Sequence, residues 1–302
     1  MFSEGRKSYP LKVKASRNLK KINNMELKEL LNRYEVTPSL TSAILGTSAE
    51  GGLIELDITQ ATHVLIAGAT GSGKSCMMNS IISSLMLKNT KETATFCLID
   101  PKRVEFFDYK DSNMLYGGEV INTTKKALLA LSALCEEMEQ RYMLLEWNKK
   151  RNYQEFKNRA CMKDIYICID ELSFLMLESK KECEEYISKI GMLGRAAGLH
   201  LILATQQPTR KIITGTIQAN IPTVIGLATR NAIDSRMIIG NNSLTKLKGK
   251  GDAIMVNGLN ETHFQGCYVN QSTIEEIVND DIQIGDFCYY DIDHQDNRIR
   301  IN

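Results

Sequence analysis

The chain has 302 residues, of which 43% are hydrophobic, and a formal net charge of +1 at pH 7. This composition excludes a disordered chain and leaves room for one large α/β domain or two small ones. The net charge points to no nucleic-acid partner, but residues 1–40 carry nine Lys or Arg and four Glu, whereas residues 271–302 carry eight Asp or Glu and two Arg. The two ends are candidates for contact with a polyanion and with a basic partner, or they are solvated terminal segments.

Cysteine spacing and hydropathy bear on the cellular compartment. The eight cysteines form no CxxC pair, which favours reduced thiols in a cytosol over disulfides or a zinc site. Met1 is followed by polar and basic sequence, which does not resemble a signal peptide. The longest charge-free run, 212–229, is interrupted by Gly and Pro and is interpreted as a loop and a buried strand. We therefore expect a cytoplasmic protein without a membrane segment of its own.

The middle of the chain alternates apolar, strand-like runs with helical patterns. The long helix expected at 123–150 rests on apolar residues at gaps of three and four. Further helices are expected at 74–87 and 181–197, and strands at 62–68, 93–100, 164–170, 199–206, 222–228, 252–256 and 262–269, the last two as a closing pair. Near-continuous apolar strands separated by helices predict an α/β fold whose central sheet is mostly parallel and is covered by helices.

The segment GATGSGKS, 68–75, matches the pattern of a phosphate-binding loop between a strand and a helix. Its glycines let backbone N–H groups turn toward phosphates, and the following helix adds its positive N-terminal end. We expect Lys74 to reach the β- and γ-phosphates of ATP and Ser75 to ligate Mg²⁺. The expected nucleotide contacts are Gly68, Ala69, Thr70, Gly71, Ser72, Gly73, Lys74, Ser75 and Cys76.

An acidic pair follows the apolar strand at 164–170, in the sequence YICIDELSFLM. In a phosphate-loop protein, an Asp at such a strand end holds Mg²⁺ directly or through water, which is the role expected of Asp170. The adjacent Glu171 is placed to polarise a water for attack on the γ-phosphate. An Asp–Glu pair at a solvated strand end is the alternative interpretation.

The strand at 199–206 ends in Thr205 and Gln206. A polar side chain at that position can touch the γ-phosphate or the attacking water, so Gln206 is a candidate catalytic residue. The alternative is a core strand that simply ends there.

These three blocks, in this order, resemble the motor domain of the FtsK/SpoIIIE family of DNA translocases. LIDPKRVEF (98–106) resembles the family's strand ending in Asp-Pro-Lys, and EEMEQRY (136–142) resembles its long-helix signature. Other matching segments are GRAAGLHLILATQQP (194–208), ITGTIQANIP (213–222), AIDSRMII (232–239) and KGKGDAIMV (248–256). The resemblance covers about residues 43–270, between a basic N-terminal arm, 1–42, and an acidic C-terminal tail, 271–302.

The resemblance implies a RecA-like ATPase that assembles as a ring, usually a hexamer, around double-stranded DNA. It also implies that an arginine of one subunit completes the ATP site of the next. Arg236 is the first candidate for this arginine, followed by Arg195 and Arg230, although an exposed Arg is often only surface. Two positions depart from the family pattern, namely Gln207, where the family has Arg, and Gly240, where it has Asp.

A ring that passes any DNA sequence must hold phosphates rather than bases. Arg210 and Lys211, on a loop after the 199–206 strand, are the candidate DNA contacts, and Lys246, Lys248 and Lys250 form a second basic cluster. Ordinary solvated side chains are the alternative. The flanks of the resemblance, 42 residues before it and about 32 after it, are too short for the membrane and winged-helix domains of the cell-division relatives.

The leading hypothesis is an ATP-driven double-stranded DNA translocase of the kind carried by plasmids, phages and integrative elements, serving DNA transfer, partition or packaging. The alternative is a conjugation- or secretion-type coupling ATPase that moves a protein or nucleoprotein, with a membrane or relaxosome protein as partner. A scaffold that binds ATP but barely hydrolyses it is disfavoured because Lys74, Ser75, Asp170 and Glu171 are all present.

Overall fold

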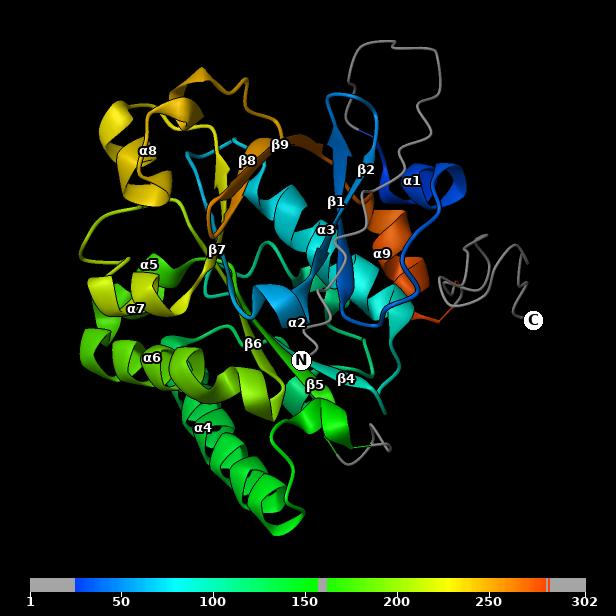
Figure 1. Cartoon of the computed structure of the whole chain (residues 1–302), viewed down its shortest axis with the longest axis vertical. Helices are drawn as coiled ribbons and strands as arrows, with labels where there is room; N and C mark the ends of the chain where they lie inside the picture. The colour runs from blue at the N-terminus through cyan, green and yellow to red at the C-terminus, as the bar shows by residue number, and fades with distance from the viewer. Residues whose placement is uncertain (1–24, 157–161, 281, 283–302) are drawn as a thin grey trace, which may run out of the picture.

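In the computed structural model, which describes residues 25–156, 162–280 and 282, nine strands form one mixed sheet. Their order across the sheet is β2-β1-β9-β8-β7-β3-β6-β5-β4. The strands are β1 (Ser42–Ser48), β2 (Leu53–Asp57), β3 (Val64–Ala67), β4 (Ala94–Ile99), β5 (Asp164–Ile169), β6 (Leu199–Thr205), β7 (Thr223–Leu227), β8 (Asp252–Asn257) and β9 (Asn260–Gly266). Figure 1 shows helices on both sides of this sheet.

One half of the sheet, β7-β3-β6-β5-β4, is parallel. Ala67 at the end of β3 pairs with Thr205 of β6, and Ile99 of β4 pairs with Ile169 of β5. The carboxyl ends of these strands therefore meet at one edge, which is where ligands bind in open α/β sheets. The expected α/β class, with each of these strands, is confirmed.

The other half of the sheet, from β8 to β2, is antiparallel. β8 pairs with β7 and with β9, so the predicted closing pair is confirmed. The β1–β2 hairpin, which pairs with β9, was not expected. Its first strand reads SAILGTS, and small and polar residues of this kind give little periodic signal. This hairpin makes the antiparallel part of the sheet larger than the sequence indicates.

The helices are α1 (Leu27–Arg33), α2 (Ile58–Ala61), α3 (Lys74–Lys88), α4 (Thr124–Trp147), α5 (Leu172–Glu178), α6 (Lys180–Ala197), α7 (Gly215–Asn220), α8 (Ala232–Ile239) and α9 (Gln271–Val278). Successive side chains of a strand point to opposite faces of its sheet. Val64 and Ile66 of β3 accordingly join the hydrophobic cluster that includes α3 and α9, while Leu65 joins the cluster that includes α4 and α6. The apolar stripe predicted on the long helix is buried as expected.

Two segments differ from, or extend beyond, the sequence interpretation. The run 212–229, expected to be a loop and a strand, also contains α7, which Thr214 caps by accepting a hydrogen bond from the N–H of Ile217. α1 and α9 lie outside the 43–270 range, yet their buried leucines and isoleucines join the core cluster around α3. Most of the predicted basic arm and acidic tail, 1–24 and 283–302, lies outside the described residues.

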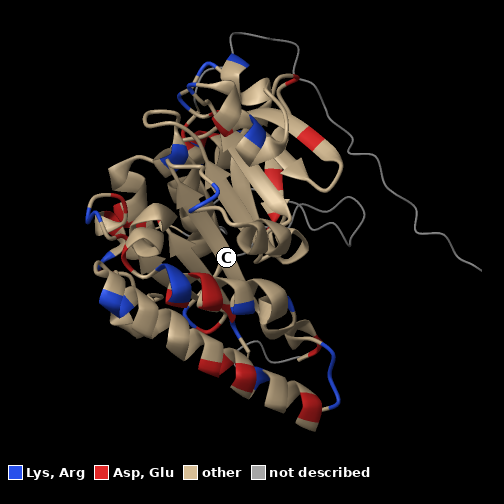
Figure 2. Cartoon of the chain, turned by 90° about the vertical axis from the view of Figure 1, so that its left-hand side faces the viewer, with Lys and Arg blue, Asp and Glu red and all other residues tan. Residues whose placement is uncertain are grey.

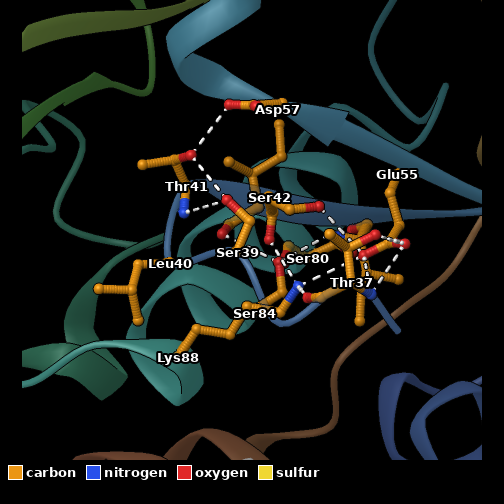
Figure 3. A network of polar contacts seen from close by, with 12 residues as sticks. Thr37, Ser39, Leu40, Thr41, Ser42, Glu55, Asp57, Ser80, Ser84 and Lys88 are labelled. Atoms are coloured by element: carbon orange, nitrogen blue, oxygen red, sulfur yellow. Dashed lines mark hydrogen bonds and ion pairs between the residues drawn. The ribbon is translucent and has the colours of Figure 1, made fainter. Parts of the chain in front are cut away.

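A polar network holds the C-terminal end of α3 against the chain that enters the sheet (Figure 3). The Nζ of Lys88 donates hydrogen bonds to the carbonyl oxygens of Thr37 and Ser42, at 3.0 and 2.9 Å. It also pairs with Glu55 Oε1 of β2 at 3.3 Å, and the Glu55 carboxylate accepts from Thr37 and Ser42. Three chain segments, 37–42, β2 and α3, are thus joined around one buried ammonium group.

Two further sequence expectations concern membranes and thiols. No helix in the described ranges is long and apolar enough to cross a membrane. Of the cysteines that the structure describes, Cys76 is exposed, and the rest are buried and unpaired, namely Cys97, Cys135, Cys168, Cys183 and Cys267. Burial raises the pKa of Cys97 to about 12, so this thiol stays protonated and behaves as a small apolar side chain.

Candidate nucleotide-binding site

The phosphate-loop segment, 68–75, connects β3 to α3 at the carboxyl edge of the sheet. Gly71 and Gly73 adopt φ angles of 78° and 109°, a region that side chains disfavour. A Cβ atom at residue 73 would lie 2.4 Å from the backbone nitrogen of Gly251. That nitrogen donates to the carbonyl of Ser72 at 2.7 Å. The turn before β8 therefore packs directly against the loop and fixes where its glycines must be.

Lys74, the first residue of α3, is buried against the end of β5. Its Nζ donates to the carbonyl oxygen of Asp170 at 2.8 Å and to Asp170 Oδ1 at 2.6 Å. Asp170 Oδ2 is buried and has no hydrogen-bond partner, and neither does Ser72 Oγ of the loop. Burial raises the pKa of Asp170, and the Lys74 charge only partly opposes that shift. Buried polar atoms without partners are rare and are typical of a site that a ligand completes.

Glu171 follows directly and is held at its Oε1 atom. Thr205 Oγ1 of β6 and Ser173 Oγ each donate to this oxygen at 2.8 Å, and the N–H of Gln206 lies 3.2 Å from both carboxylate oxygens. Lys102 Nζ lies 3.2 Å from Oε2. Burial acts to raise the pKa of Glu171, but the hydrogen bonds from Thr205 and Ser173 and the Lys102 charge outweigh it and lower that pKa. The side chain is thus a charged, oriented carboxylate.

The loop and the end of β6 are in contact. Thr70 Oγ1 donates to Gln206 Oε1 at 2.8 Å, and the backbone nitrogen of Gln206 contacts Glu171, so Gln206 lies between the phosphate loop and Glu171. Ser75, on the first turn of α3, is half-buried, and Cys76 faces solvent. The structure therefore brings together the loop, Asp170, Glu171 and Gln206, which lie far apart in the sequence.

Arg236 lies away from these residues, on α8. Its side chain is exposed, and Nη1 donates to Asn242 Oδ1 at 3.0 Å. Arg236 and Arg210 line one groove of about 820 Å³, together with Ile213, Asp234 and other residues of α7, α8 and the loop after β6. Two arginines that the sequence assigned to different roles are therefore neighbours across one hollow. We find no contact between either of them and the phosphate loop of the same chain in the described residues.

The remaining basic candidates are also exposed. Arg195 borders a separate hollow beneath α6, next to Tyr142 and Tyr153. Figure 2, which faces α4, α6 and α8, shows acidic and basic residues interspersed, without a broad surface of one sign. The other exposed candidates are Lys211, Arg230, Lys246, Lys248 and Lys250.

One of the two departures from the family pattern has a local explanation. Gly240 ends α8 in the left-handed conformation, with φ 79°, which glycine adopts without strain. Gln207 is exposed, and its N–H donates to Thr205 Oγ1 at 3.1 Å.

Three partners of Glu171 were not predicted as site residues. Ser173 lies two residues after Glu171 in α5, whereas Thr205 reaches Glu171 from the neighbouring strand β6. Lys102 stands in LIDPKRVEF, a segment noted only for its resemblance to the family. The pairing of β4 with β5, which brings Lys102 beside Glu171, was not predicted from the sequence.

A glycine-rich loop between a strand and a helix, a buried Lys on an Asp, and a Glu at the adjoining strand end define a P-loop NTPase of the RecA-like type. The FtsK_SpoIIIE family model matches residues 31–165 and 157–210. This chain belongs to the FtsK/SpoIIIE family.

Individual relatives agree with this assignment. The chain is 36% identical over 275 residues to the DNA translocase FtsK of Lactiplantibacillus plantarum, covering 86% of this chain and 34% of that protein. It is 37% identical over 266 residues to the DNA translocase FtsK of Caldanaerobacter subterraneus, covering 86% of this chain and 37% of that protein. The chain therefore spans about a third of the length of these curated relatives.

Solved structures share the fold. The pCW3 conjugation coupling protein TcpA, solved with ATPγS, superposes with a TM-score of 0.71 and 26% identity over 81% of this chain and 72% of that one. The cytoplasmic domain of the Type VII secretion ATPase EccC from Thermomonospora curvata gives a TM-score of 0.72 at 24% identity, over 85% of this chain and 34% of that one, and supports the fold alone.

Proposed function

We propose that this chain binds ATP with Mg²⁺ and hydrolyses it to move double-stranded DNA, working in the cytoplasm as a ring-shaped homo-oligomer, a hexamer. Residues 43–270 form the motor in this proposal, and 1–42 and 271–302 form its basic arm and acidic tail. The observation that carries the proposal is the grouping of Lys74, Asp170 and Glu171 beside the phosphate loop, in a chain whose 36–37% identical relatives are named DNA translocases.

The donor set suits a magnesium nucleotide. The orphaned Asp170 Oδ2 and the Ser75 hydroxyl are oxygen ligands, which Mg²⁺ prefers, and the ion would neutralise phosphate charge. The backbone N–H groups of 68–73 and the end of α3 would hold the phosphates, and Lys74 would turn from Asp170 toward the β- and γ-phosphates.

Hydrolysis then needs one proton acceptor near the γ-phosphate. Glu171 takes a proton from a water whose oxygen bonds to the γ-phosphorus, while the bond from that phosphorus to the β–γ bridging oxygen breaks and ADP leaves. Thr205 and Ser173 hold the carboxylate in place for this step. Gln206, fixed by Thr70, orients the water.

Arg236 is our candidate for the arginine that completes the neighbouring subunit's site, where its charge would stabilise the transition state. Arg210 and Lys211 are the candidate DNA contacts. Because Arg210 shares a groove with Arg236, a DNA-facing loop and a subunit contact would lie next to each other on this surface.

The first experiment measures ATP hydrolysis with and without linear double-stranded DNA. We expect the wild-type chain to be stimulated by DNA, and the stimulation to vanish as salt rises, because phosphate contacts release counterions. Arg210→Ala combined with Lys211→Ala should weaken the stimulation at unchanged DNA-free turnover. A wild-type rate that no DNA changes would refute DNA translocation.

A second candidate function is a coupling ATPase for conjugation or secretion, favoured by the 26% identity to the conjugation coupling protein TcpA. A membrane or relaxosome protein would be its partner. Stimulation by a substrate protein or peptide, together with indifference to DNA, would support this function and exclude the first.

A further inference from the structure

The two oxygens of the Glu171 carboxylate have unequal surroundings. Oε1 accepts from two hydroxyl groups, those of Thr205 and Ser173, each at 2.8 Å. Oε2 accepts no hydroxyl; it shares the N–H of Gln206 and faces Lys102 Nζ at 3.2 Å. Oε1 therefore anchors the side chain, and Oε2 is the oxygen left for a water.

Lys102 is held much less firmly than the other lysine of the site. Its side chain is 30% exposed and makes only this one polar contact within the described residues. Lys74 is 3% exposed and lies 2.6 Å from Asp170. One member of this ion pair is partly in water, which screens the attraction, so an incoming anion can compete for it. The contact therefore holds Lys102 against the Glu171 carboxylate, but it can be broken when an anion competes for Lys102.

The loop that presents Lys102 is rigidly built. The carboxylate of Asp100 accepts hydrogen bonds from four successive backbone N–H groups, at 2.8 to 3.1 Å. Arg103, within this turn, takes the left-handed φ of 60°, a strain that the surrounding bonds maintain. The four donors belong to Arg103, Val104, Glu105 and Phe106.

The strands place this turn beside the acidic pair. Ile99, the last residue of β4, pairs with Ile169, the last residue of β5. Asp100 therefore stands next to Asp170. Lys102, two residues after Asp100, reaches the carboxylate of Glu171, the residue after Asp170. The Lys102–Glu171 contact thus results from the strand pairing and the Asp100 turn, not from an unrestrained surface side chain.

We propose that Lys102 is a positioning residue that restrains Glu171 in the resting subunit. Its ammonium group occupies Oε2 and blocks the approach of water to that oxygen. Hydrolysis then requires Lys102 to leave, and the anionic phosphates of the bound nucleotide are its competing partner. This inference rests on the proposed ATP hydrolysis and adds a regulator to it.

The kinetic test uses Lys102→Met, which removes the charge, and Lys102→Arg, which keeps it. We expect Lys102→Met to raise the DNA-free kcat about two- to fivefold, the range that loss of such an ion pair allows. The KM for ATP should stay within a factor of about two, because the variant loses the contact of Lys102 with the phosphates together with the resting ion pair that this contact replaces. Lys102→Arg should keep the low DNA-free rate. A DNA-free kcat of Lys102→Met at or below that of the wild type would overturn the proposal.

Lys110→Met is the matched control. Lys110 follows the same turn, but its Nζ lies over the ring of Phe107, 4.4 Å from the centroid, and contacts no acidic residue of the site. Its DNA-free kcat should equal that of the wild type. An equal rise in both variants would mean that loss of any positive charge on this loop acts, which contradicts a specific restraint.

A readout without turnover separates this inference from the proposed function. Amine-reactive labelling with mass spectrometry, on protein free of nucleotide, measures how available each lysine is. Glu171→Gln should increase the labelling rate of Lys102 and leave that of Lys110 unchanged. No change at Lys102 would overturn the restraint even if ATP is hydrolysed. If the labelling of Lys102 increases in Glu171→Gln but the wild type does not hydrolyse ATP, the hydrolytic function is refuted. The Lys102–Glu171 ion pair would then be present without a role in hydrolysis.

Discussion

The two ends of α3 carry buried lysines that differ in how fully they are satisfied. Lys88, at the C-terminal end, has three acceptors from three residues, and its partner Glu55 has donors for both oxygens (Figure 3). Lys74, at the N-terminal end, contacts Asp170 alone, and one oxygen of that carboxylate has no partner. Burial lowers the pKa of Lys88 against the opposing charge of Glu55, and raises that of Asp170 against Lys74.

The difference separates a structural pair from a functional one. A buried ion pair offsets its desolvation only when further hydrogen bonds satisfy the remaining donors and lone pairs. The Lys88 network meets that condition within the fold itself. In the Lys74–Asp170 pair, Asp170 Oδ2 has no partner, so the desolvation cost of this pair is offset only when another group binds. Five variants and one ligand test whether this contrast holds.

The largest expected effect is on stability, in Lys88→Met. Removing the ammonium leaves two carbonyl groups and the Glu55 carboxylate without their partner, and breaking a buried pair in this way destabilises by about 3–5 kcal/mol. Denaturant unfolding measures the loss. ATP turnover per folded molecule should stay near that of the wild type.

The double variant Lys88→Met with Glu55→Gln serves as control. Removing the second charge should restore part of the lost stability, because no unpaired carboxylate then remains. If the single variant Lys88→Met unfolds with the same free energy as the wild type, the Lys88 network does not stabilise the fold. The contrast between the two ends of α3 would then fail.

The next effect is on catalysis, in Lys74→Met. Losing one preorganised cation at a reacting phosphate should lower kcat about 10²–10³-fold, equivalent to about 2.7–4 kcal/mol. Because Lys74 contacts a single residue, we expect a smaller loss of folding stability than in Lys88→Met. Steady-state turnover and denaturant unfolding on the same preparations compare the two. A reversed order of the two stability losses would break the comparison.

The smallest expected effect is stabilisation by ligand. ATPγS with Mg²⁺ at 100 times its Kd should stabilise the wild type by about 2.7 kcal/mol. Asp170→Asn should lose the part of this gain that depends on Mg²⁺, because it removes the carboxylate oxygen that has no partner. Ser42→Ala, in the network at the other end of α3, should keep the whole gain. The measurement is the unfolding midpoint with Mg²⁺ and with EDTA; an equal gain in Asp170→Asn would contradict the assignment.

Much of the fold could be predicted from the sequence because local patterns and tertiary burial agree there. The strands β3 to β6 are near-continuous apolar runs and the long helix α4 has a periodic apolar stripe, and each was found within a few residues of its expected bounds. The β1–β2 hairpin, α7 and α8 could not be found in this way. β1 and α7 are rich in small and polar residues, and β2 and α8 are short, so all four are ordered by contacts with distant parts of the chain, such as the pairing of Gly46 with Gly266.

The site was predictable where one segment holds its own chemistry. The loop 68–75 and the Asp170–Glu171 pair could be predicted because each is a recognisable pattern within one short segment, at a backbone turn and at a strand end respectively. Lys102 and Thr205 act through partners 69 and 34 residues away. Which of the oxygens of Glu171 they contact depends on strand register and side-chain geometry, and no short sequence pattern encodes either.

The close packing of Gly73 against Gly251 has a consequence for engineering this protein. The turn that ends at residue 251 and the phosphate loop are two parts of one rigid unit, since a single methyl group at 73 would overlap the backbone of the turn. Grafting the loop 68–75 alone into another scaffold would leave the carbonyl of Ser72 without its donor and the loop without its support. A chimera must therefore exchange both segments together, although 175 residues of other sequence separate them.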